Sequence, residues 1–224
     1  MTKRLVVLDT ETTGMKAEEG HRVIEIGMVE ILGRRLGRAA QHYLNPERDI
    51  EAGAFAVHGL SRQFLEDKPR FHEIAKDFLD FMDGAELIMH NAEFDKKFLD
   101  AELARASLPP LAHHCAKVVD SLKVARNLFP GQRNSLDALC ARLGVDASRR
   151  SLHGALLDAT LLAKVWLAMT RGQEDFFSKD EGFSLLLPRK PKEKPLVLRA
   201  SDDERQAHEI FLASLSQEGE SVSW

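Results

Sequence analysis

The sequence is poor in several features that mark other classes of protein. It has two cysteines, Cys115 and Cys140, among 224 residues, too few for a disulfide framework and consistent with a reducing compartment. No apolar run approaches the ~20 residues that a membrane-spanning helix needs. The opening MTKRLVVLD is not a signal peptide, because its apolar part stops at Asp9. We therefore expect a cytoplasmic protein.

Excess positive charge is also lacking. Lys and Arg number 31 against 35 Asp and Glu, which gives a formal net charge of −4 and a pI near 6.2. Affinity for nucleic acid through bulk electrostatics requires many contacts between basic side chains and phosphates. This composition argues against such a protein, but it leaves room for an enzyme that touches a few phosphates through metal ions.

What the sequence does contain is the pattern of an α/β domain. Apolar or alternating runs at 5–8, 22–32, 41–46, 86–89 and 117–121 predict strands, with a turn around 33–37 between the second and the third. Helical spacing predicts helices within 50–81, after Asn91, and at about 121–128, 135–143 and 155–170. Asn91 and Ser135 are expected N-caps, and Gly144 an expected C-terminal stop. Successive strands followed by strands alternating with helices indicate a mixed sheet flanked by helices.

The composition changes after Gly172. The stretch LPRKPKEKP (187–195) concentrates proline and lysine and is typical of an extended, solvated linker. We therefore expect one folded domain over residues 1–172, followed by a flexible C-terminal tail over residues 173–224.

The first motif with chemical meaning is LVVLDTETTG, where a buried strand ends in two acids. Asp9 and Glu11 point to the same face of a strand, with their stems roughly 7 Å apart. At an effective dielectric near 20 two such charges repel by about 2.5 kcal/mol. Either one acid takes up a proton or a cation lies between them; the alternative is an exposed, hydrated strand end.

The second motif, HNAEFD (90–95), follows a predicted strand. It places His90 and Asn91 at the end of the strand and Asp95 in the first turn of the next helix. An acid near a helix N-terminus is stabilised by the helix dipole, so Asp95 alone needs no further explanation. Ligands of α/β proteins, however, commonly bind at the carboxyl ends of strands.

The third motif, HGALLD (153–158), precedes and enters an apolar helix. If both residues were helical, His153 and Asp158 would diverge by about 140°, but a histidine in the preceding loop can converge with the acid. A lone histidine before a helix is more often a surface residue. An aspartate in a largely apolar helix is harder to explain, because a buried unpaired carboxylate is costly.

Taken together, the acids arrive from a strand end and two helix starts at one edge of the sheet. Ligands that are all oxygen favour Mg²⁺ or Mn²⁺ over a tetrahedral zinc site. Such a cluster suits hydrolysis with two ions about 4 Å apart that clamp the attacking and leaving oxygens of a phosphodiester. His153 is then the candidate base that deprotonates the attacking water.

DTETTG, HNAEFD and HGALLD resemble the three motifs of the DEDD 3′→5′ exonucleases, in the subtype with a histidine five residues before the last acid. The resemblance covers residues 5–170. It implies a ribonuclease H-like fold and two divalent cations. The implied catalytic residues are Asp9, Glu11, Asp95, His153 and Asp158, of which the four acids are the metal ligands.

Further segments are similar to the proofreading subunits of bacterial replicative DNA polymerases: AFAVHG (54–59), VVDS (118–121), RNSLDALCAR (133–142) and LAMTRGQ (167–173). This resemblance implies removal of mispaired nucleotides from a DNA 3′ end. The residues that it implies in substrate binding, besides the acids Asp9, Glu11 and Asp158, are Thr10, Thr12, His58, His90 and Asn91.

The tail carries two expected docking elements. Gln173 followed by Phe176 and Phe177 resembles the peptides that enter the hydrophobic pocket of a sliding clamp; the alternative is a helix end folded onto the domain. Beyond the linker, Ser201–Glu204 has the form of a capping box.

The helix that this capping box starts would carry Ile210, Phe211 and Leu215 on one face. A short amphipathic helix after a linker suits docking into a groove, and the resemblance implies the polymerase subunit as partner. Packing back onto its own domain is the alternative. A tether of this kind raises the local concentration of substrate, so the weak positive charge is no obstacle. A small accessory subunit is a further possible partner.

Two other functions stay open from the sequence. An RNA-trimming exonuclease of the same fold would carry the same motifs, because these residues contact phosphate and metal and not the sugar. A scaffold that joins polymerase to clamp without catalysis is the other, although it would not need five intact site residues.

Overall fold

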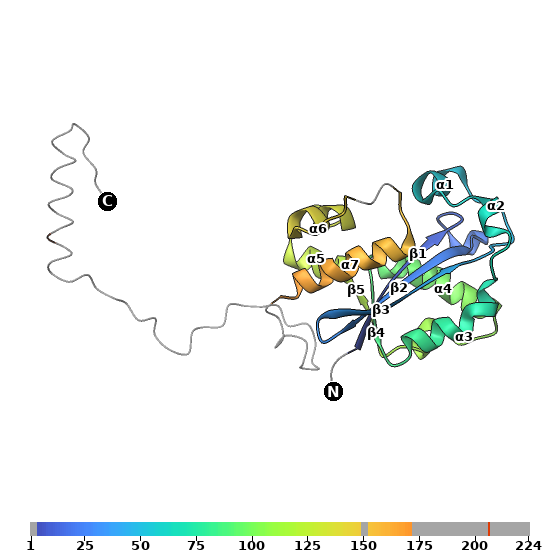
Figure 1. Ribbon diagram of the computed structural model, residues 1–224, viewed down its shortest axis with the longest axis horizontal. Helices are drawn as coiled ribbons and strands as arrows, with labels where there is room; N and C mark the ends of the chain where they lie inside the picture. Colours follow the sequence, from blue (N-terminus) through green and yellow to red (C-terminus); the bar gives the residue numbers. More distant parts are fainter. Residues whose placement is uncertain (1–3, 149–151, 172–205, 207–224) are drawn as a thin grey trace. The chain divides into compact units, whose positions relative to one another are not determined.

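The computed structural model describes residues 4–148, 152–171 and 206. Five strands and seven α-helices make up the fold over these residues (Figure 1). The strands are β1 Arg4–Thr12, β2 Val23–Leu32, β3 Arg35–Tyr43, β4 Glu86–Met89 and β5 Lys117–Asp120. The α-helices are α1 Ala52–His58, α2 Arg62–Leu65, α3 Phe71–Met82, α4 Ala92–Arg105, α5 Ser121–Leu128, α6 Leu136–Leu143 and α7 Ala155–Met169, with short 3₁₀ turns at Ala17–Glu19 and Leu111–His113.

The strands form a single mixed sheet in the order β3-β2-β1-β4-β5. The β1–β2 and β2–β3 pairs are antiparallel, and the β1–β4 and β4–β5 pairs are parallel. Val6, Val7 and Leu8 of β1 are completely buried, as expected of a central strand covered on both faces. The predicted α/β class with a mixed sheet is confirmed.

Helices cover both faces of this sheet, and the side chains of β1 alternate between two cores (Figure 1). Val6 and Leu8 pack with the buried residues of α3 and α4, whereas Val7 packs with those of α6 and α7. The carboxyl end of β1 therefore presents alternate side chains to α4 on one face and to α7 on the other.

Helix α7 is anchored to the β2–β3 hairpin at both of its ends. A Cβ atom on Gly27 would lie 2.2 Å from the backbone nitrogen of Leu156, so the first turn of α7 can lie on β2 only where the side chain is a hydrogen atom. At the other end, Arg34 donates hydrogen bonds to the carbonyl oxygens of Leu167 (2.7 Å) and Thr170 (3.2 Å). These are carbonyls that the helix cannot satisfy itself.

Two local predictions, the bounds of the third strand and the capping bond of Asn91, need correction. The third strand runs from Arg35 to Tyr43 and not over 41–46, and the turn before it is a tight pair, Gly33 and Arg34, both with positive φ. Because β3 is an exposed edge strand, it lacks the apolar pattern of the others. Asn91 does stand at the N-cap of α4, but its backbone is left-handed (φ 68°) and its side chain makes no capping bond. The caps at Ser135 and Gly144 are confirmed.

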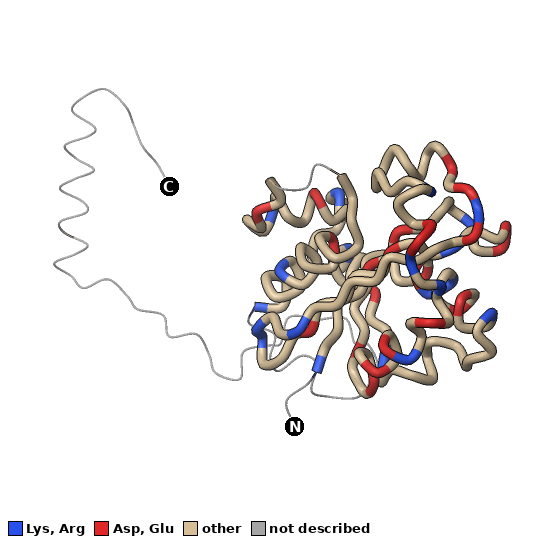
Figure 2. The backbone as a smooth tube through the Cα atoms, turned by 45° about the vertical axis from the view of Figure 1, so that its right-hand side comes forward, with Lys and Arg blue, Asp and Glu red and all other residues tan. Residues whose placement is uncertain are grey.

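Basic and acidic positions are interspersed along the described backbone (Figure 2). This distribution agrees with the absence of a large excess of either charge in the sequence. In the part of the chain that the structure describes, no helix has the length and apolarity needed to cross a membrane.

Candidate active site

The end of β1 provides side chains to both faces of the sheet. By the alternation set by Val7, Asp9 and Glu11 lie on the face covered by α7, whereas Thr10 lies on the face covered by α4. Thr10 and Glu11 are buried and Asp9 is half-buried. The pairing with β2 shifts by one residue between Glu11 and Thr12, where the strand ends.

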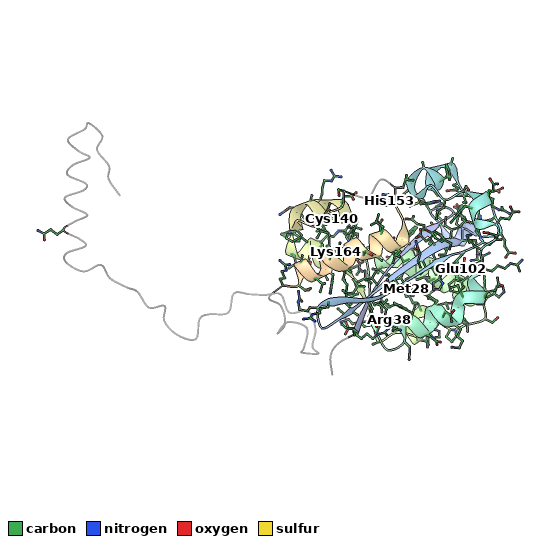
Figure 3. The ribbon with its side chains drawn as sticks, in the orientation of Figure 1. Met28, Arg38, Glu102, Cys140, His153 and Lys164 are labelled. Atoms are coloured by element: carbon green, nitrogen blue, oxygen red, sulfur yellow. The ribbon has the colours of Figure 1, made fainter. Side chains whose placement is uncertain are left out.

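On the α7 face, Glu11, His153 and Asp158 come together. One ligand atom from each lies within 4.8 Å of the others, although the three residues span 147 positions of the sequence. The Nδ1 atom of His153 lies 3.1 Å from Oδ2 of Asp158, and the His153 backbone N–H donates to the Val57 carbonyl at 3.1 Å. Figure 3 shows His153 where α7 begins, on the side of α1. The predicted convergence of the loop histidine and the helix acid is therefore present.

On the α4 face, Asp95 is enclosed instead of joining this group. Its Oδ1 atom accepts a hydrogen bond of 2.7 Å from the Thr10 hydroxyl, and the residue is 3% exposed. Burial raises the pKa of Asp95 to about 7, against the opposing effect of the Thr10 hydrogen bond. The expectation of four acids in one pocket is thus met only in part. Within the described residues, Glu11 and Asp158 assemble with His153, and neither Asp9 nor Asp95 is within mutual reach of all three.

The donor set fits a hard divalent cation. Glu11 and Asp158 offer carboxylate oxygens, the ligands that Mg²⁺ and Mn²⁺ prefer, and these lie within 4.8 Å of each other beside His153. A buried carboxylate such as Asp95, which otherwise holds its proton up to about pH 7, ionises readily beside a cation.

His58 is the second histidine at this end of the molecule. It is 5% exposed at the end of α1, its Nδ1 atom accepts from the Leu60 backbone N–H at 3.0 Å, and its buried Nε2 atom has no hydrogen-bond partner among the described residues. Burial lowers the pKa of His58, the proximity of His153 lowers it further, and the Thr12 carbonyl offsets part of the shift. A buried nitrogen of this kind is costly unless a ligand satisfies it.

Both ring nitrogens of His90, by contrast, have partners within the protein. Its Nδ1 atom lies 2.9 Å from the Ser121 hydroxyl oxygen, and its Nε2 atom lies 2.9 Å from the Asn134 carbonyl oxygen. Burial lowers the pKa of His90, which favours the neutral ring that donates from Nε2 and accepts at Nδ1. With both ring nitrogens engaged, His90 joins strand β4 to α5 and to the loop before α6. This arrangement does not favour the contact with a nucleotide that the sequence suggested.

The remaining predicted contacts are at the end of β1 and the start of α4. The Thr12 hydroxyl donates to the Gly14 carbonyl at 2.7 Å, which shapes the turn after the strand. The Asn91 backbone N–H lies 3.3 Å from Oδ1 of Asp120, so Asp120 supports the left-handed conformation. The Asn91 side chain is exposed and, with Met15 and Phe94, lines a cavity of about 220 Å³.

The chain is similar in sequence and in fold to known proteins. A model of the family described as "Exonuclease" matches residues 6–166. The chain belongs to the exonuclease family. The match spans the three acidic motifs and all five predicted catalytic residues.

Within this family of exonucleases, the similarity to one group is much closer. The chain is 48% identical to DNA polymerase III subunit epsilon of Escherichia coli (strain K12) over 236 residues, which cover 99% of this chain and 97% of that protein. It is 43% identical to DNA polymerase III subunit epsilon of Haemophilus influenzae over 241 residues, with 99% and 94% covered. The resemblance drawn from the motifs is confirmed.

The fold is that of the same family. The crystallographic structure of the nuclease domain of 3′hExo, a DEDDh family member bound to rAMP, superimposes with a TM-score of 0.64 at 21% identity, over 76% of this chain and 92% of that one. The predicted ribonuclease H-like exonuclease fold is therefore confirmed.

One acid of this exonuclease was missed from the sequence. Glu25 of β2 is paired opposite Glu11, is 1% exposed, and accepts a 2.7 Å hydrogen bond from Gln41 on β3. A Cβ atom on Gly154 would lie 3.9 Å from its Oε2 atom, so the carboxylate faces the start of α7. A charged residue inside the apolar run VIEIG was the available signal. Its charge adds to the negative potential that favours a cation near Glu11.

The predicted docking residues of the tail lie outside the described residues. These are Gln173, Phe176 and Phe177 for the clamp and Ile210, Phe211 and Leu215 for the polymerase.

Proposed function

We propose that this exonuclease removes mispaired nucleotides from the 3′ end of a DNA primer, as the proofreading subunit of the replicative DNA polymerase III in the cytoplasm. The observation that carries the proposal is the assembly of Glu11, His153 and Asp158 within 4.8 Å, at the end of a strand and the start of a helix that are distant in sequence. The relatives named DNA polymerase III subunit epsilon, similar over nearly the full chain, support the substrate and the assembly.

The proposed cation ligands are the four carboxylates of Asp9, Glu11, Asp95 and Asp158. Two Mg²⁺ or Mn²⁺ ions held there would neutralise the attacking and leaving oxygens of the terminal phosphodiester. The raised pKa of Asp95 and the burial of Glu11 and Asp158 support a site that is incomplete without positive charge.

His153 is the proposed base for the attacking water. A carboxylate only accepts hydrogen bonds, so Asp158 orients the ring by accepting from Nδ1–H at 3.1 Å, which leaves the lone pair of a neutral imidazole on Nε2. The His153 side chain is 44% exposed, so water can reach it. The backbone bond from His153 to Val57 fixes the loop that carries it.

His58 is the proposed contact to the terminal nucleotide. Its buried Nε2 atom has no partner among the described residues and its lowered pKa keeps the ring neutral, so Nε2 can make one specific hydrogen bond to a substrate atom. Asn91 and Thr12 border the same strand ends and are proposed to line the path of the nucleotide. Thr10 acts instead through its hydrogen bond to Asp95.

The tail is proposed as the tether. Residues 1–172 form the exonuclease domain in this proposal. In residues 173–224, Gln173, Phe176 and Phe177 bind the sliding clamp, and Ile210, Phe211 and Leu215 bind the polymerase III alpha subunit. Removal of residues 178–224 should leave nuclease activity and abolish co-elution with the polymerase. Co-elution of the truncated protein would contradict the tether.

The test of the function is the release of mononucleotides from a 5′-labelled primer whose 3′ terminus is either paired or mismatched. We expect degradation from the 3′ end that requires Mg²⁺ or Mn²⁺ and is faster at the mismatch, because a mismatched terminus melts more easily. Asp9→Ala should abolish hydrolysis without loss of fold, measured by circular dichroism. Retained hydrolysis in the Asp9→Ala protein would contradict the assignment.

The same assay separates the two alternatives. Strong preference for an RNA strand over a DNA strand of equal sequence would favour an RNA-trimming exonuclease. Absence of hydrolysis together with absence of Mn²⁺ binding would favour a non-catalytic scaffold between polymerase and clamp.

A further inference from the structure

A second feature of the structure lies outside the acid group. A cavity of about 590 Å³ opens between the β1–β2 connection, the loop from β3 to α1, helix α2 and the end of α4. Its lining residues are Gly20, Arg22, Pro46, Glu47, Arg48, Asp49, Arg62 and Arg105. Four arginines from separate segments thus share one cavity in a protein whose net charge is negative.

Arg22 forms the rigid wall of this arginine cavity. Its side chain is 17% exposed and donates to both carboxylate oxygens of Glu102 at 2.6 and 2.8 Å and to the Pro46 carbonyl at 3.3 Å. Glu102 is 1% exposed on α4, and its pairing with Arg22 offsets the cost of burying its carboxylate. A guanidinium held in this way needs little further ordering to bind an anion.

Among the residues that line the cavity and their ion-pair partners, the charges do not cancel. Glu102 serves two guanidiniums, because Arg105 also lies 3.6 Å from its Oε1 atom. Arg48 makes a single hydrogen bond with the described residues, to the Glu19 carbonyl at 3.3 Å, and no ion pair with them. Two positive charges therefore remain without a carboxylate of their own.

The two acids that line the cavity are already paired. Glu47 lies 3.0 Å from Arg70, and Asp49 lies 3.1 Å from Arg62. The side chain of Asp49 is 97% exposed, so its pairing is weak. Five guanidiniums, counting Arg70, stand against the three carboxylates of Glu47, Asp49 and Glu102, which leaves a surplus of two positive charges.

The arginine cavity lies close to the acids Glu11 of β1 and Asp95 of α4. The Thr13 backbone N–H donates to the Arg22 carbonyl and the Glu51 backbone N–H donates to the Thr13 carbonyl, both at 2.9 Å. Thr13 is two residues, about 7 Å of strand, beyond Glu11. On the other side, Glu102 is seven residues, about 10 Å of helix, beyond Asp95. Figure 3 shows Glu102 away from His153.

We propose that the arginine cavity binds backbone phosphates of the substrate strand, roughly three or four nucleotides from the 3′ end that enters the acid group. The inference rests on the proposed exonuclease function. Two unneutralised guanidiniums match one or two phosphates, and arginine forks suit phosphate oxygens. The cavity gives this protein of negative net charge a local contact with the strand, which holds the strand in register for the next cut.

The test uses the full-length protein and the double variant Arg48→Gln/Arg105→Gln. Arg105 is exposed, Arg48 is half-buried and the Arg22–Glu102 pair is left intact, so we expect the fold to be retained; a thermal melt checks this. Affinity for 5′-fluorescein oligothymidylates of about twelve and about three nucleotides is measured by anisotropy in EDTA. We expect the variant to lose roughly fivefold to tenfold in affinity for the long strand, and its salt slope to fall by about 1.4.

The matched control is Arg35→Gln/Arg126→Gln, which removes the same charge from exposed positions on β3 and α5. We expect it to change neither the salt slope nor the ratio of long-strand to short-strand affinity. An equal loss for long and short strands, or equal losses in variant and control, overturns the proposal. An acidic protein segment as the true occupant would give this result. Because binding is read without metal, a failure of the proposed hydrolysis is detected separately.

Discussion

The two faces of β1 differ at its carboxyl end. On the α7 face, Glu11 and Asp158 share their space with His153, which is 44% exposed. On the α4 face, one residue away along the strand, Asp95 is sealed beneath α4 with a single side-chain hydrogen bond from Thr10. On the α7 face His153 is open to water, whereas on the α4 face burial raises the pKa of the Asp95 carboxyl to about 7. Acids that look equivalent in the sequence therefore have different environments.

A substitution on the α7 face should cause the largest loss of hydrolysis. Asp158→Asn keeps the shape of the side chain but removes the charge that we assign to metal binding and to the orientation of His153. We expect hydrolysis to fall to background in the mononucleotide-release assay. The control is Asp80→Asn on the exposed side of α3, a surface charge paired with Lys76. Comparable rates in the two variants would contradict the role of Asp158.

His153→Gln should give the next largest effect. Loss of a general base costs typically 10² to 10⁴ in rate. Because the carboxylates remain, Mn²⁺ affinity measured by titration calorimetry should change little. A large loss of Mn²⁺ affinity would show that His153 is a ligand and not the base, an alternative that its distance from Glu11 and Asp158 makes worth testing.

On the α4 face, the raised pKa of Asp95 predicts how the free energy of unfolding changes with pH. In the metal-free protein the pKa of Asp95 is about 7, above the ~3.9 of an unfolded chain. The folded state therefore keeps a proton that the unfolded state has lost, and the free energy of unfolding falls as pH rises from about 4 to about 7. Asp95→Asn should remove this decline and stabilise the metal-free protein above pH 7, by on the order of 1 to 4 kcal/mol.

Denaturant unfolding of the wild type and the Asp95→Asn protein at several pH values measures the difference directly. The same variant should be inactive, so loss of function and gain of stability occur together. A variant with the wild-type slope between pH 4 and pH 7 would show that Asp95 does not carry the proton.

The smallest predicted effects concern His58 and His90. His58→Gln should raise KM for an oligonucleotide by about tenfold, because its Nε2 atom makes no bond within the described protein. It should lower the melting temperature less than His90→Gln, because it removes one hydrogen bond, from the Leu60 backbone N–H, instead of two. His90→Gln should instead lower the melting temperature, because it removes contacts with Ser121 and Asn134. Exchange of these two phenotypes would restore His90 as a substrate contact.

The sequence predicted the parts of this site that depend on local spacing. The acids of β1 share a face because strands alternate, and Asp158 lies near the start of α7 because the apolar residues around it have helical spacing. Both follow from properties of a few consecutive residues.

The parts that failed depend on distant partners. The left-handed backbone of Asn91 is held by Asp120, 29 residues away, and the Thr10–Asp95 bond joins residues 85 positions apart. Strand β3 was misplaced because an exposed edge has no core to impose an apolar period. Local patterns contain no information about such contacts.

The anchoring of α7 has a mechanical consequence. This helix carries Asp158 near its start and ends four residues before the tail begins at 173. If the tail is the tether proposed above, a pull along it would reach the hydrogen bonds from Arg34 to Leu167 and Thr170 first, while the opposite end of the helix rests against Gly27. These contacts with the β2–β3 hairpin lie some 13 Å of helix away from Asp158. They would hold the end of α7 in place and leave the position of Asp158 unchanged.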